Sequence, residues 1–243
     1  MSAAENNSSF LLSLTTIDFI LATLTIFGNL LLLTTILFNP LRCLRTPTTY
    51  FIANLAFSDL LIGLLIGYGR AVVEYFQYVD EAEPRWIAIV MNIGGGATLI
   101  SGIWTVIALA LDRYLAVTDP LHYSERVTAR RVVMFISLSW PLALALPAPY
   151  PFAGQSWPIF LLTFSHTHFT IPVLLLLALY FRIFRSLSRR RSELLRLTTS
   201  ISTMTLRHTL ERERKMAITS LMILILFCTS FLPFYIKDRK SVV

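Results

Sequence analysis

The chain has 243 residues, of which 55% are hydrophobic and only 14% are charged. A soluble domain carries about 25% charged residues, so this composition excludes an ordinary soluble protein and indicates one membrane domain. The formal net charge of +7 would suit nucleic acid, but the basic residues gather in alternate loops, so we expect no nucleic-acid partner.

Six apolar runs are long enough to cross a hydrocarbon core of about 30 Å as helices. The sequence predicts these spans at residues 17–38, 48–70, 86–117, 132–150, 159–183 and 216–236. The expected fold is therefore all-α, a polytopic bundle of transmembrane helices in the lipid bilayer. Residues 1–16 form an N-terminal tail in this prediction, 184–215 a long loop whose first part continues the preceding helix, and 237–243 a C-terminal tail.

Basic residues divide the loops into two kinds. Most loop arginines lie in the first, third and fifth loops, whereas the second and fourth loops contain a single basic residue, Arg85. The positive-inside rule then makes the odd loops cytoplasmic and the N-terminus extracellular, as in a multi-pass protein of the plasma membrane. Glycosylation sequons begin at Asn6 and Asn7, on the side where glycosylation occurs. The basic loops face anionic lipid or a cytoplasmic partner.

Polar residues inside the spans are candidates for function, because ionisable groups are costly in lipid. Asp59 lies deep in the second span, and Asn29 lies in the middle of the first. A carboxylate at that depth needs a cation, water or protonation, and a structural polar contact is the alternative. Asp112 and Arg113 end the third span, where snorkelling to water is the alternative to a functional role.

Six motifs stand in order on the predicted spans. They are Gly28-Asn29, Leu55-Ala56-x-x-Asp59, Asp112-Arg113-Tyr114 followed by Pro120-Leu121, Trp140, Pro172 with Tyr180, and Phe227-x-x-Ser230-Phe231-Leu232-Pro233. Each motif is weak alone, but together they make residues 17–236 resemble rhodopsin-like (class A) G-protein-coupled receptors. The resemblance implies a seven-helix receptor fold. It also implies a receptor, not an enzyme, that passes an extracellular ligand signal to a heterotrimeric G protein by movement of the sixth helix.

The resemblance assigns roles at the cytoplasmic end of the bundle. Arg113 is implied to close the cytoplasmic gate in an ionic latch with Glu213 and then to meet the G protein. Asp112 competes for the same guanidinium, and Tyr180 moves towards Arg113 in the open state. The implied coupling set is Asp112, Arg113, Tyr114, Leu121, Tyr180 and Glu213.

The resemblance also implies a polar core and an outer ligand pocket. Asp59, with Asn29 nearby, matches a sodium-linked aspartate, but Gly102 stands where a serine often completes that site, with Ser101 beside it. A sodium ion near Asp59 is the one cofactor considered, and no other metal is expected. In the pocket, Gly95 replaces the aspartate of amine receptors, which disfavours a typical biogenic amine as the ligand. The pocket candidates are Asp18, Arg70, Glu74, Gly95, His168, Phe231 and Phe234.

Arg70 and Glu74 are spaced i, i+4 and can simply pair with each other.

The sequence ends after the sixth span, so we expect the seventh helix of the family to be missing. We therefore expect a truncated receptor with impaired signalling, or a non-signalling chain that interacts with full-length receptors. A six-span transporter is a weaker alternative because no internal repeat is visible. An intramembrane enzyme is weaker still because Asp59 is the one deep carboxylate.

Overall fold

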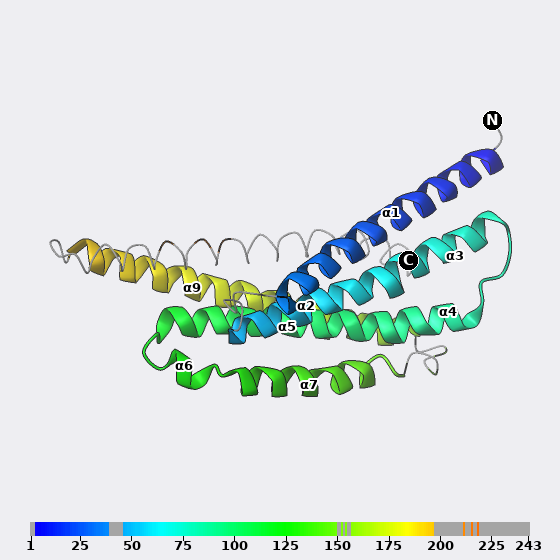
Figure 1. The fold of residues 1–243 in the computed structure, drawn as a ribbon. Helices are drawn as coiled ribbons and strands as arrows, with labels where there is room; N and C mark the ends of the chain where they lie inside the picture. Colours follow the sequence, from blue (N-terminus) through cyan, green and yellow to red (C-terminus); the bar gives the residue numbers. More distant parts are fainter. Residues whose placement is uncertain are drawn as a thin grey trace. The chain divides into compact units, whose positions relative to one another are not determined.

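The computed structural model describes residues 3–38, 46–149, 152, 154, 157–196, 211, 215 and 218. Every regular element in these residues is a helix, which confirms the all-α prediction for the described part (Figure 1). The chain divides into two compact units. Unit 1 comprises Met1–Thr105 and Ala129–Trp157, and unit 2 comprises Val106–Thr128 and Pro158–Val243.

Four helical stretches of the described residues are long and apolar enough to cross a membrane. They are Ser9–Leu37, Pro47–Tyr78, Arg85–Thr118 and Leu162–Arg189. The span predicted at 132–150 corresponds to α7, Ala129–Ala145, whose 17 residues give a length of about 25 Å. The sixth predicted span, 216–236, lies outside the described residues except for position 218.

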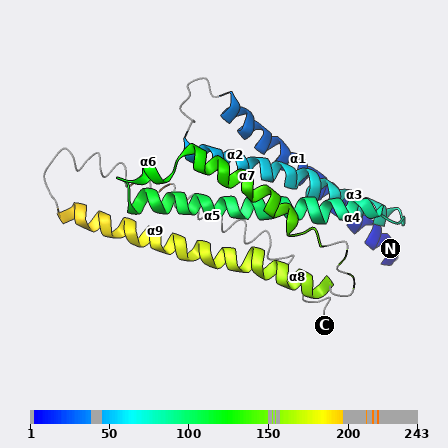
Figure 2. The same ribbon diagram turned by 90° about the horizontal axis from the view of Figure 1, so that it is seen from below.

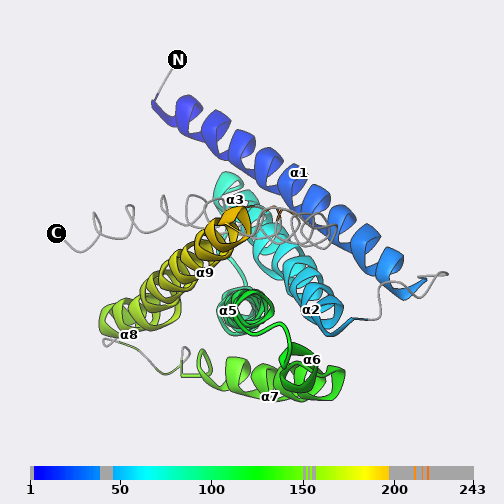
Figure 3. The same cartoon turned by 90° about the vertical axis from the view of Figure 1, so that its left-hand side faces the viewer.

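Unit 1 is built on two long helices that pack side by side. The first is α1, Ala3–Leu37, and the second runs through α2, Pro47–Ile62, the π-helical turn η1, Gly63–Gly67, and α3, Tyr68–Tyr78 (Figure 3). The second helix begins where Thr46 accepts a hydrogen bond from the Thr49 amide at 3.3 Å, with Pro47 in the first turn.

Two predicted boundaries in unit 1 are wrong. The first helix begins at Ala3 and not at residue 17, because apolar residues already recur from Phe10 onward. The second helix continues past residue 70 to Tyr78, because Arg70 is neutralised within the unit and does not end the helix. The helix ends where Asp80 adopts a left-handed φ of 57°.

Small residues let the two long helices of unit 1 approach closely. A Cβ added at Gly67 would lie 2.6 Å from the Cβ of Ala22 on α1, and one at Gly63 would lie 2.8 Å from Ile26 Cγ1. Helices in lipid associate through such close backbone packing, because lipid tails are as apolar as the side chains that they touch.

Unit 1 also contains the start of the third long helix and the whole of α7. Helix α4, Arg85–Ile89, leads through the π-helical turn η2, Val90–Gly95, into α5, Gly96–Thr118. Helix α7 packs against α2, where the rings of Phe57 and Trp140 meet edge to face at 5.7 Å. The predicted end of this span at residue 150 is wrong by five residues, because Pro147 and Pro149 cannot continue a helix.

Unit 2 contains the end of α5, the short α6, Tyr123–Arg126, and a long helix of three parts (Figure 2). These parts are α8, Trp157–Ser165, the π-helical turn η5, His166–Thr170, and α9, Ile171–Arg196. The ring of Pro172 would clash with the carbonyl of residue 168 in a regular helix, so a widened turn directly before the proline has a physical cause. The prediction that this helix continues through its arginines is confirmed.

We predict that Gly67→Ala destabilises unit 1 by about 1–3 kcal/mol, because the new methyl group must displace the backbone of α1. Gly28→Ala on α1 is the matched control, since no atom lies within 4 Å of its added Cβ. Thermal unfolding of the purified protein in detergent measures both. A Gly67→Ala midpoint equal to or above that of Gly28→Ala would contradict the close approach of the two helices.

Candidate functional site

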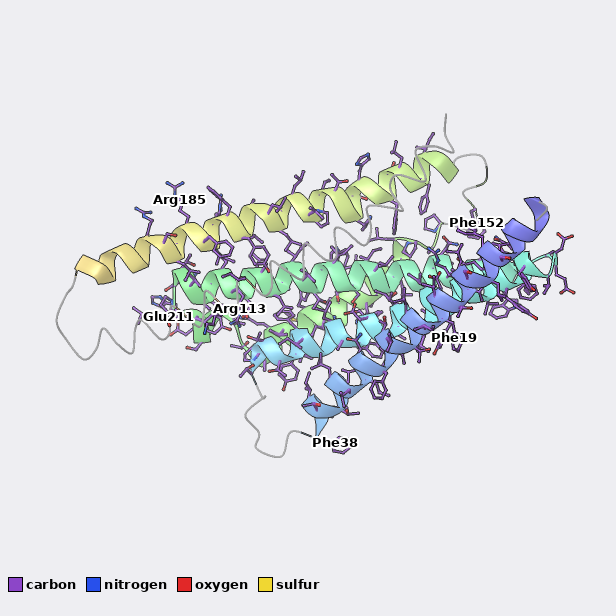
Figure 4. All side chains as sticks on the ribbon, turned by 90° about the horizontal axis from the view of Figure 1, so that it is seen from above. Phe19, Phe38, Arg113, Phe152, Arg185 and Glu211 are labelled. Carbon is purple, nitrogen blue, oxygen red and sulfur yellow. The ribbon has the colours of Figure 1, made fainter. Side chains whose placement is uncertain are left out.

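The C-terminal end of α5 holds a buried acid beside an arginine (Figure 4). Asp112 has a side chain that is 1% exposed, and its Oδ2 accepts hydrogen bonds from Arg113 Nη2 at 2.6 Å and from Arg113 Nε at 3.1 Å. Two donors from one guanidinium to one carboxylate make a strong, charge-assisted contact. Asp112 therefore binds Arg113, whereas competition with Glu213 stays a prediction because Glu213 lies outside the described residues.

A third residue, Tyr123, completes this arrangement. Its hydroxyl donates to Asp112 Oδ1 at 2.7 Å. The helix ends at Thr118 because Pro120 disfavours helix at the residue before it, and the following turn returns Tyr123 to the carboxylate. The sequence analysis missed Tyr123. The available signal for this contact was the order of an acid at the helix end, a proline-containing turn and then a tyrosine.

The turn after α5 is held by its own charged cluster. Asp119 contacts His122 Nδ1 at 2.9 Å and Arg126 Nη2 at 3.2 Å through its two oxygens. The hydrogen bond from His122, with the charges of His122 and Arg126, lowers the pKa of the Asp119 carboxyl below 3.8. The carboxylate form, which favours this turn, therefore persists as the pH falls through the ordinary range for an aspartate.

The structure separates the remaining predicted coupling residues into exposed and buried ones. Leu121 projects from the turn and is 85% exposed. Tyr180 of α9 is buried in the apolar core of unit 2, with Ala110 and Val117 of α5, and Tyr114 packs against the same core. Leu121 is therefore available for contact, whereas Tyr180 is enclosed inside the unit.

Unit 1 contains a second polar cluster, which is centred on Asn54 of α2. Asn54 Oδ1 accepts a hydrogen bond from Trp140 Nε1 of α7 at 3.0 Å. Because an indole nitrogen only donates, this bond fixes the orientation of the amide. Asn54 Nδ2 then donates to Thr105 Oγ1 at 2.7 Å and makes a longer contact of 3.5 Å with Ser101 Oγ. One amide thus joins three helices, a role that the sequence analysis did not assign to it.

The predicted sodium site is less complete than this cluster. Asn29 Nδ2 donates to the Thr25 carbonyl of its own helix at 2.9 Å. A Cβ added at Gly102 would lie 3.8 Å from the Cβ of Ser58 on α2. Because Gly102 has no side chain, this position of α5 supplies no hydroxyl to the predicted site. The described residues hold no group of three or more His, Cys, Asp or Glu side chains suited to a metal. A sodium ion near Asp59 stays a prediction.

Three predicted pocket residues form an ion cluster between α1 and α3. Arg70 Nε lies 2.9 Å from Asp18 Oδ2, and Arg70 Nη2 lies 3.3 Å from Glu74 Oε1. The expected i, i+4 pair is thus confirmed, and Asp18 extends it to a second helix. The cluster carries two acids and one base, so both carboxyl groups contact the same guanidinium within a largely apolar helix pair.

The other pocket candidates lie apart from this cluster. Gly95 packs against Ile66, whose Cγ1 would lie 2.6 Å from an added Cβ, so a larger residue there must displace Ile66. His168 is held by its own helix, through Nδ1 contacts with the Phe164 carbonyl at 3.1 Å and with Thr167 Oγ1 at 2.7 Å. Phe231 and Phe234 lie outside the described residues, and so do the side chains of Asn6 and Asn7.

Four helices of membrane-spanning length and apolar composition in the described residues are typical of a polytopic membrane protein. A family model described as 7 transmembrane receptor (rhodopsin family) matches residues 28–238, and the chain belongs to this family. It is therefore a G-protein-coupled receptor by family and not an enzyme.

Individual receptors show the same relationship. The chain is 31% identical to a Dopamine D2-like receptor of Drosophila melanogaster, over 69% of this chain and 19% of the relative. It is 29% identical to the human 5-hydroxytryptamine receptor 1D, over 74% of this chain and 50% of that relative. A Gq-coupled rhodopsin of Mizuhopecten yessoensis is 27% identical over 82% of this chain and 44% of its own length. The chain thus spans half or less of these curated relatives.

We predict that Tyr123→Phe lowers the stability of unit 2 by about 1.5–3 kcal/mol, because a buried carboxylate loses a hydrogen-bond donor. Tyr75→Phe on α3 is the control, since the Tyr75 side chain is 51% exposed. Hydrogen exchange of the amides between residues 112 and 126 measures the effect directly. Equal exchange in the two variants would show that Tyr123 does not hold Asp112.

Replacing Asn54 by leucine should cost about 1–2 kcal/mol. Trp140 Nε1 then loses its acceptor, and Thr105 Oγ1 keeps only its bond to the Ser101 carbonyl. Asn29→Leu serves as the control, because the amide of Asn29 bonds to its own helix. The thermal midpoints of the two purified variants give the comparison. The three-helix role of Asn54 would be refuted by a larger loss in Asn29→Leu.

Proposed function

We propose that this chain carries a receptor function in which an extracellular ligand signal reaches a heterotrimeric G protein at the C-terminal end of α5. The observation that carries this proposal is the buried Asp112 carboxylate that holds Arg113 through two hydrogen bonds. A guanidinium held in this way can bind another partner only after its contact with Asp112 breaks. Its release from Asp112 would present five donors to a partner that offers backbone carbonyls or carboxylates.

The turn beside Arg113 supports the same contact surface. Leu121 is 85% exposed, on a turn that Asp119, His122 and Arg126 keep in shape. An exposed apolar side chain beside a releasable arginine suits a protein partner, because such interfaces combine apolar anchors with arginine. In this proposal the turn lies in the cytoplasm and the N-terminus lies outside the plasma membrane.

The proposed switch has two parts beyond Arg113. Movement of the sixth helix, residues 216–236, opens the surface, and Glu213 competes with Asp112 for the guanidinium in the closed state. Tyr180 supports the open state from the core of unit 2. Family membership and the Asp112–Arg113 pair support these proposed roles.

The proposed ligand is not an amine held by a carboxylate on the third span. The names of several relatives refer to dopamine, octopamine and 5-hydroxytryptamine. In this chain Gly95 takes the place of the amine-binding aspartate, and Ile66 fills the space beside it. The ion cluster of Asp18, Arg70 and Glu74 offers both signs of charge to a ligand and suits a zwitterionic or hydrogen-bonding molecule better than a simple cation.

The test measures guanine-nucleotide exchange on heterotrimeric G proteins in membranes of cells that express this chain. We expect exchange above that of untransfected membranes. Arg113→Ala should lower it at least tenfold, about 1.4 kcal/mol, whereas the exposed Arg130→Ala of α7 should not. Dopamine, octopamine and 5-hydroxytryptamine should not raise it. A surface-expressed chain without any exchange activity, or equal effects of the two arginine variants, would overturn the proposal.

A further inference from the structure

Helix α9 of unit 2 has two faces that meet different surroundings. One face carries Leu176, Tyr180, Ile183 and Leu187, all of which are buried against the end of α5. These positions follow the i, i+4, i+7, i+11 spacing of one side of a helix. The packing continues as far as Leu187, so the part of α9 that contains the first arginines is a folded helix fixed to the unit.

The opposite face of α9 is apolar, and among the residues that the structure describes its side chains are exposed. Leu174 is 61% exposed, Leu177 49% and Phe181 67%. Their i, i+3, i+7 spacing places them on one stripe, turned away from α5. In a helix of transmembrane length such a stripe faces lipid tails.

This lipid-facing stripe continues directly into arginines. Arg182, Arg185 and Arg189 are exposed. At about 100° per residue they lie about 100°, 40° and 80° around the helix from Phe181, so all three are on the half of α9 that faces away from its buried face. Figure 4 shows Arg185 on the side of α9 that points away from α5. The three arginines therefore lie above the membrane-facing side of the helix and not on the side that packs inside the unit.

The depth of these arginines matches the headgroup layer. The stretch from Leu162 to Phe181 has about 20 residues and spans about 30 Å, the thickness of the hydrocarbon core. Arg182 follows at the boundary, Arg185 lies about 6 Å beyond Phe181, and Arg189 about 12 Å beyond it. Helical side chains lean towards the helix N-terminus, so the arginine at 189 reaches back towards the membrane.

We propose that Arg182, Arg185 and Arg189 form a binding ridge for the phosphates of anionic phospholipid headgroups. The leaflet is the one at the C-terminal end of α9, which is the cytoplasmic leaflet in the proposed topology. A guanidinium binds phosphate oxygens through paired donors, and a ridge of three can hold more than one headgroup. A soluble acidic partner suits this ridge less well, because the apolar stripe below it keeps that side of α9 against lipid.

The test uses the purified chain in detergent, titrated with phosphatidylserine or with phosphatidylcholine and analysed by native mass spectrometry. We expect the unaltered chain to bind phosphatidylserine more tightly than phosphatidylcholine. The variant Arg182→Gln, Arg185→Gln, Arg189→Gln should lose about tenfold or more in affinity for phosphatidylserine. The matched control is Arg85→Gln, Arg130→Gln, Arg131→Gln, which removes the same charge from other exposed positions and should keep the preference.

Several outcomes would overturn the proposal. An equal loss in both triple variants would show that binding follows net charge alone. Full displacement of phosphatidylserine by inorganic phosphate at constant ionic strength would show a site for a soluble anion. Where a triple variant fails to keep its helical circular dichroism, the single Arg185→Gln variant replaces it, and an unchanged affinity there refutes the ridge.

Discussion

A buried carboxylate at the end of α5 organises the part of this receptor that faces its proposed partner. Asp112 accepts donors from Arg113 and from Tyr123, so both of its oxygens are occupied while it is almost fully shielded from solvent. An uncompensated charge in that position would be costly, because burial removes its hydration. Arg113 from the helix and Tyr123 from the following turn compensate the buried charge by donating hydrogen bonds to it. The position of the turn therefore depends on the carboxylate.

Elsewhere the structure relies on packing and hydrogen bonds that suit lipid. Burial of apolar surface does not drive helices together in a bilayer, so close backbone approach and interhelical polar contacts become the main attractive terms. Unit 1 uses both. Gly67 allows contact with Ala22, and Asn54 connects α2 with α5 and α7 through its two amide atoms. The ion cluster around Arg70 adds a third, charged connection between α1 and α3.

The sequence predicted the helices better than it predicted their ends or their contacts. Hydropathy alone located the first three spans and the fifth, because a run of apolar residues has few alternatives in lipid. The ends were wrong where a polar residue lies inside a helix, as Arg70 does, because only the three-dimensional partner Asp18 shows that its charge is compensated.

The sites show the same limit. The acid–arginine pair is adjacent in sequence and was predicted, whereas the contacts of Tyr123 with Asp112 and of Asn54 with Trp140 join residues 11 and 86 positions apart. A proline-containing turn gives a local signal for the first contact, but no local pattern encodes the second. In the ion cluster of Arg70, the contact with Glu74 was predicted because the two residues are one helix turn apart. The contact with Asp18 on another helix was not predicted.

Arg113 and Arg185 differ in how far their side chains are buried, and this difference indicates different functions. Arg113 has a side chain that is 14% exposed and is held by a buried acid, so any partner must compete with a strong internal contact. Arg185 is exposed on a helix face that continues a lipid-facing stripe, so its partner need displace only water. Contacts of the first kind respond to a conformational change, because competition between two acceptors is sensitive to small shifts in position. Contacts of the second kind are suited to a constant task, and the proposed ridge would fix the depth and rotation of α9 while the proposed switch at Arg113 changes state.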